Sequence, residues 1–145
     1  MSRFDIRGVA VLSLAAVALI TASPAVAAGC SDPGFESAAI AALGQRNKAI
    51  GQAYLDNYAS AKADAFVGWR TVIEAPVPCD SRLRNVRRHL LRHLGALWLS
   101  YAARAAGDID YGLAFLVAAS REAALANAAV ASATASLPLT GGLAS

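Results

Sequence analysis

The sequence predicts an all-α fold, an antiparallel four-helix bundle whose first helical region folds back on itself. Three observations lead to this prediction. Apolar residues recur at three- and four-residue intervals through three long segments, Pro and Gly separate these segments, and no run alternates between apolar and polar residues as a strand does. Much of the apolar content is Ala, which favours helix and lets helices pack closely.

The N-terminus has the layout of a secretory signal over residues 1–27. Arg3 and Arg7 precede an apolar run at residues 8–20, and the small residues Ala25 and Ala27 follow it. That run of about 13 residues is too short to span a membrane, which takes roughly 20. We therefore expect an exported protein, periplasmic or secreted.

An exported chain would consist of a helical-bundle domain at residues 28–136 and a disordered tail at residues 137–145. The alternative treats residues 27–30 as a loose lipobox, which would make Cys30 the acylated first residue of a lipid-anchored protein. We expect no transmembrane segment in the mature chain, because polar residues interrupt its apolar runs.

The first helical region is expected from Asp32 to Glu74. Asp32 is the expected N-cap and Pro33 the first helical residue. The helical stripe continues without a change of phase until Pro76-Val77-Pro78, which cannot extend a helix.

Two further helices follow. Asp80 or Ser81 is the expected cap of the second, whose apolar stripe runs from Leu83 to Tyr101 before Gly107 closes it. The third begins at about Asp108 and runs to about residue 133. Because the link between them is short, these two helices must lie antiparallel.

The two cysteines, Cys30 and Cys79, indicate a disulfide in an oxidising compartment. A straight helix of about 40 residues would hold its ends ~60 Å apart, whereas a disulfide needs Cα atoms within about 7 Å. The helix must therefore break, either between Gly44 and Gly51 or between Leu55 and Ser60, and the second place gives better matched arms. The alternative is a three-helix bundle with one long helix and no intramolecular bond.

Five arginines at the start of the second helix form an unusual charge pattern. They occupy N-terminal turns, where the helix dipole disfavours cations, so they predict a contact surface for an anionic envelope component or a protein partner. The alternative is a solvated face neutralised by neighbouring acids. The residues are Arg82, Arg84, Arg87, Arg88 and Arg92.

His89 and His93 stand four residues apart on one helix face, the spacing of paired metal ligands. They support an alternative function, the binding of a transition metal or haem by a periplasmic protein. No catalytic motif or nucleic-acid module stands out. We therefore expect a non-catalytic binding protein with no cofactor and no nucleic-acid partner.

Overall fold

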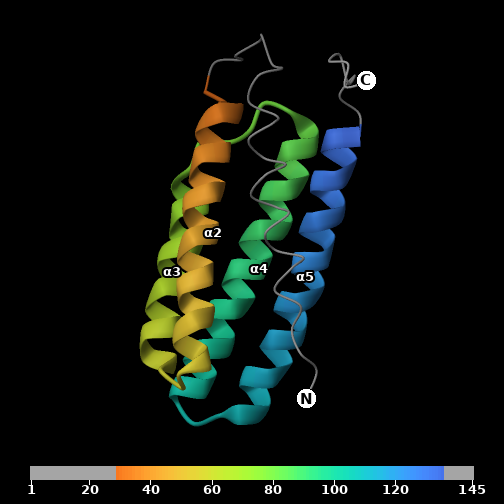
Figure 1. The fold of residues 1–145 in the computed structure, drawn as a ribbon. Coiled ribbons are helices and arrows are strands. Elements are labelled where there is room, and N and C mark those ends of the chain that lie inside the picture. The colour runs from red at the N-terminus through yellow and green to blue at the C-terminus, as the bar shows by residue number, and fades with distance from the viewer. Residues whose placement is uncertain (1–28, 136–145) are drawn as a thin grey trace, which may run out of the picture.

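The computed structural model describes residues 29–135, which form four helices (Figure 1). The predicted signal at residues 1–27 and tail at residues 137–145 lie outside this range. The helices are α2 (Asp32–Tyr54), α3 (Tyr58–Glu74), α4 (Ser81–Ala105) and α5 (Ile109–Ala135). The predicted all-α four-helix bundle is thereby confirmed, and the alternative with one long first helix is wrong.

The first helical region turns back at residues 55–57, within the segment predicted to break. The amides of Leu55 and Asn57 both donate to the carbonyl of Gln52, which ends α2. Asp56 has a φ of 56°, a left-handed conformation that Asp adopts more easily than most residues. Asn57 then caps α3 by accepting a hydrogen bond from the amide of Ser60. Short polar side chains therefore reverse the chain although the apolar stripe continues across them.

The predicted disulfide joins Cys30 to Cys79, with the two Cα atoms 5.1 Å apart. Beside it, the amide of Ser31 donates to the carbonyl of Val77 at 3.0 Å. The expected N-cap at Asp32 was wrong. Ser31 caps α2, while the carboxylate of Asp32 accepts from the amides of Cys79 and Asp80, at 2.7 and 3.1 Å. Asp32 thus holds the starts of α2 and α4 together.

Helices α4 and α5 form the predicted antiparallel pair (Figure 1). Gly107 turns the chain with a φ of 85°, and Asp108 accepts a hydrogen bond from the amide of Tyr111. The Ser100 hydroxyl donates to the carbonyl of Gly112 at 2.7 Å and joins the two helices near this turn. By length and composition alone, Ile109–Ala133 could cross a membrane; in this fold it packs along α4, with 22% of its most apolar stretch buried.

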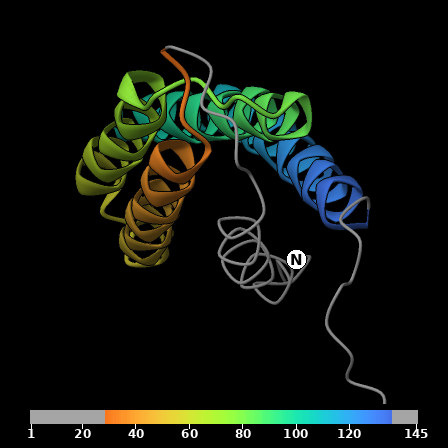
Figure 2. The same cartoon turned by 90° about the horizontal axis from the view of Figure 1, so that it is seen from above.

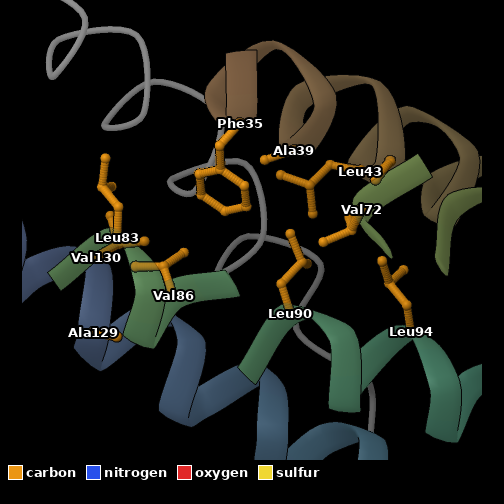
Figure 3. Packing of buried hydrophobic residues seen from close by; sticks show 11 residues of the cluster. Phe35, Ala39, Leu43, Val72, Leu83, Val86, Leu90, Leu94, Ala129 and Val130 are labelled. Atoms are coloured by element: carbon orange, nitrogen blue, oxygen red, sulfur yellow. The ribbon is translucent and has the colours of Figure 1, made fainter. Parts of the chain in front are cut away.

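The helices follow one another along an arc, with α2 and α5 at its two ends (Figure 2). Each packs on its neighbour in sequence, α2 also touches α4, and the backbones of α2 and α5 are not in contact. One apolar cluster lies near the disulfide, where Phe35 reaches toward α4 and α5 (Figure 3). A second cluster, around Leu97 and Tyr101, fills the end with the α2–α3 and α4–α5 turns. Residues of the second cluster, among them Leu97 and Tyr101, also line the candidate site.

Candidate functional site

A cavity of about 270 Å³ lies between α2, α4 and α5, with Tyr58 of α3 at one end. Most of its wall is apolar, two arginines belong to it, and no carboxylate lines it within the described residues. Helix α4 forms its floor, while α2 and α5 form its sides. The lining residues are Arg46, Ile50, Ala53, Tyr54, Tyr58, His93, Leu97, Ser100, Tyr101, Arg104, Leu116, Ala119, Ser120 and Ala123.

Arg46 is the principal polar group of this cavity. It lies on the inward face of α2, only 3% of it is exposed, and its Nε is buried without a hydrogen-bond partner among residues 29–135. Burial lowers the pKa of its guanidinium to about 10, and the Tyr101 side chain opposes this effect only in part. Burying a cation without a partner costs free energy, so an anion bound at this side chain would be stabilising.

His93 lies on the α4 side of the same cavity and is also buried. Its Nδ1 lies 2.8 Å from the carbonyl of Ala119, which can only accept, so Nδ1 carries the proton. Burial first, and Arg46 in addition, lower the pKa of His93 to about 4. The ring is therefore neutral at physiological pH and adds no second positive charge next to Arg46.

The other end of the cavity is aromatic. Tyr54 is 65% exposed there, and the Arg104 guanidinium lies over the ring of Tyr58, 4.7 Å from its centroid. Tyr101 lies deeper, and burial raises the pKa of its hydroxyl to about 12. The cavity thus runs from Arg46 and His93 at one end to Tyr58 and Arg104 near the helix turns.

The arginine-rich start of α4 has a structural explanation that the sequence did not reveal. Arg87 donates to the carbonyls of Val72 and Ile73 at the C-terminal end of α3, at 3.3 and 3.2 Å. Cations are favourable at that end of a helix, so Arg87 compensates α3 rather than α4. Arg84 donates to the carbonyls of Pro78 and Cys79.

The remaining three arginines lie near polar or acidic side chains. Arg82 pairs with Asp80, and Arg88 donates to the side chain of Asn85. Arg92 lies 4.0 Å from Glu122 and is mostly exposed. Arg84, Arg88 and Arg92 are exposed on α4. An anionic contact through these five residues stays a prediction.

The two histidines predicted as metal ligands are buried, and their Nδ1 atoms have different partners. His89 Nδ1 lies 2.7 Å from Glu122 Oε2, whereas His93 Nδ1 faces the carbonyl of Ala119. Among the described residues, no group of three or more His, Cys, Asp or Glu side chains is arranged to hold a metal ion. Metal or haem binding by this pair stays a prediction.

Glu36 is a second buried charge that sequence reasoning missed. It is 1% exposed, and neither carboxylate oxygen has a hydrogen-bond partner. Burial, with a smaller contribution from the charge of Asp32, raises its pKa to about 7. The positions of Glu36 and Arg46 in the sequence could have predicted their burial, because both lie on the apolar face of α2 rather than on its polar face.

The fold and the cavity define the chain as a disulfide-tied helical bundle with a cationic, apolar-walled cavity between its helices. Comparison with models of protein families, with curated proteins and with solved structures found no match.

Proposed function

We propose that the chain is an exported, non-catalytic binding protein that takes an anionic ligand into the cavity between α2, α4 and α5. The unpartnered, buried guanidinium of Arg46 carries this proposal. An anion at Arg46 would form charge-assisted hydrogen bonds in a place that water hardly reaches, where such bonds are strong. Apolar walls around a buried cation suit a ligand that is itself amphipathic.

In this proposal the anion binds at Arg46 inside the cavity and not at the arginines at the start of α4. Arg84 and Arg87 have acceptors of their own on the backbone, whereas Arg46 has none among the described residues. Export is supported by the signal layout and by a disulfide, which persists in oxidising compartments. The absence of a catalytic role is part of the proposal, because the described residues that line the cavity include no nucleophile with an adjacent base.

The test uses anilinonaphthalene sulfonate, an amphipathic anion whose fluorescence rises in apolar surroundings. We expect it to bind the wild-type protein and to bind Arg46→Gln more than about tenfold more weakly, since hydrogen bonds to a charged group contribute roughly 1.5–3 kcal/mol. Arg88→Gln is the matched control, because Arg88 is exposed and outside the cavity. Circular dichroism of each variant verifies that the helices are intact.

Equal affinity of wild type and Arg46→Gln would overturn the proposal. A loss of binding in Arg88→Gln together with retention in Arg46→Gln would return the anion contact to the surface of α4. The alternative, a metal or haem held by His89 and His93, has its own measurement: metal analysis and absorption spectra of protein purified from its native compartment.

A further inference from the structure

We propose that the ligand of this cavity is a single-chain aliphatic carboxylate, with its carboxylate at Arg46 and its alkyl chain directed toward Tyr54. This inference rests on the proposed function, which specifies only an anion and a cavity. It adds the charge of the ligand, its shape and its orientation. Each of these follows from a separate set of residues.

The charge of the ligand follows from the arginines. Arg46 is one unpartnered cation, and a carboxylate can accept two parallel hydrogen bonds from one guanidinium. The other lining arginine, Arg104, is already engaged with the ring of Tyr58, 4.7 Å from its centroid. A dianion at Arg46 would therefore bring a second charge into a buried place without a second cation, which is costly.

The size of the cavity indicates a slender ligand. Its volume of about 270 Å³ lies between the ~150 Å³ cavity that holds benzene and the roughly 300–1,000 Å³ pockets of drug-sized molecules. That volume extends along about three turns of α4, from His93 to Arg104. A long and narrow space of this kind suits an alkyl chain better than a ring system.

The walls between the two ends offer little to a polar chain. Ile50, Leu97 and Leu116 face this stretch from the three helices. The two serine hydroxyls there already donate, Ser100 to the carbonyl of Gly112 and Ser120 to that of Leu116. An alkyl chain has no hydrogen-bonding groups that these walls would leave unpaired. A hydroxylated chain would bury donors there without acceptors, which costs free energy.

Calorimetric titration with hexanoate, octanoate, decanoate, decanol and decyl phosphate tests the class of ligand on the wild-type protein. We expect the Kd of the acids to fall by about fourfold for each added CH₂ group, the fold-change that corresponds to ~0.8 kcal/mol. Decanol, which lacks the charge, should bind more than about tenfold more weakly than decanoate. Tighter binding of decyl phosphate than of decanoate, or no dependence on chain length, would overturn the inference.

The orientation is tested with Ala53→Leu, which adds bulk on α2 near the aromatic end of the cavity, seven residues beyond Arg46. This variant should lose affinity for decanoate and keep its affinity for hexanoate. Ala41→Leu is the matched control, because Ala41 lies on the exposed face of the same helix. Equal losses for both acids would place the chain elsewhere.

The two proposals fail in different ways. If anilinonaphthalene sulfonate does not bind, or if Arg46→Gln binds it as tightly as the wild type does, the proposed function itself fails. If Arg46-dependent binding of anilinonaphthalene sulfonate persists while neither chain length nor Ala53→Leu has an effect, only the aliphatic carboxylate is ruled out. The titrations of the wild-type protein test the class of ligand even if Ala53→Leu does not fold.

Discussion

Replacing Arg46 by Met tests whether this buried cation is kept for a ligand rather than for the fold. One pKa unit is worth about 1.4 kcal/mol, so the fall of the guanidinium pKa from 12.5 to about 10 places the cost of its charge near ~3 kcal/mol. Met has a similar length, fills irregular spaces and carries no charge. We therefore expect ligand-free Arg46→Met to be more stable than the wild type by about 1–3 kcal/mol, as replacement of buried charges by apolar residues often gives.

Urea unfolding followed by circular dichroism measures this difference, and Arg88→Met is the control. Because Arg88 is exposed, its replacement should stay within about 0.5 kcal/mol of the wild type. Addition of decanoate should raise the stability of the wild type by mass action and leave Arg46→Met unchanged. A destabilised Arg46→Met would refute the reasoning, since it would mean that the guanidinium already has a favourable partner in the ligand-free fold.

Two further predictions concern the frame around the cavity. Cys79→Ser opens a loop whose ends are 49 residues apart, and the chain-entropy relation puts the loss of stability at about 4 kcal/mol. Urea unfolding measures this loss. A loss under about 1 kcal/mol would show that the contacts of Asp32 hold that end of the bundle together without the disulfide. Arg87→Ala should cost about 1–2 kcal/mol, because two carbonyls at the end of α3 lose a charged donor. Its control, Arg88→Ala, should be nearly neutral, and equal effects of the two substitutions would argue against a specific role of Arg87.

The fold was largely predictable because its determinants are local. Proline and glycine separate the helices, and the requirement to bring Cys30 near Cys79 excluded a straight first helix. The break at residues 55–57 followed from side chains that favour turns. The error at the first N-cap was also local, since both Ser31 and Asp32 can cap a helix, and only the amides of Cys79 and Asp80, brought close by the fold, decide how Asp32 is used.

The candidate site was not predictable in the same way. The arginines of α4 drew attention because they contradict the dipole of their own helix, yet Arg87 serves the end of α3, which becomes its neighbour only in the folded chain. Arg46 appeared in the sequence as one of several charges on α2. Its importance comes from what surrounds it, a cavity formed by α4 and α5 without an acidic side chain among the described lining residues.

The last prediction concerns Glu36 and His93, whose buried side chains should give stability opposite dependences on pH. The folded-state pKa of Glu36, about 7, is raised above its ordinary value of 4.5, so the unfolded state releases this proton first. Stability therefore falls as pH rises from about 4.5 to about 7. The folded-state pKa of His93, about 4, lies below its ordinary 6.5, so the unfolded state binds this proton first, and stability rises over the interval from about 4 to about 6.5.

The two slopes nearly cancel in the wild type between about pH 4.5 and 6.5. In this interval the folded state binds close to one proton more at Glu36, and the unfolded state binds close to one proton more at His93. Glu36→Gln removes the falling slope, so its stability should rise with pH across this interval and exceed that of the wild type at neutral pH. The measurement is urea unfolding at half-unit steps of pH, with Glu74→Gln as the control, because Glu74 is an exposed carboxylate of α3 paired with Arg70. A wild-type profile that rises as steeply as that of Glu36→Gln would show that Glu36 ionises as freely in the folded protein as in the unfolded chain. A flat profile in Glu36→Gln would show instead that burial does not lower the pKa of His93.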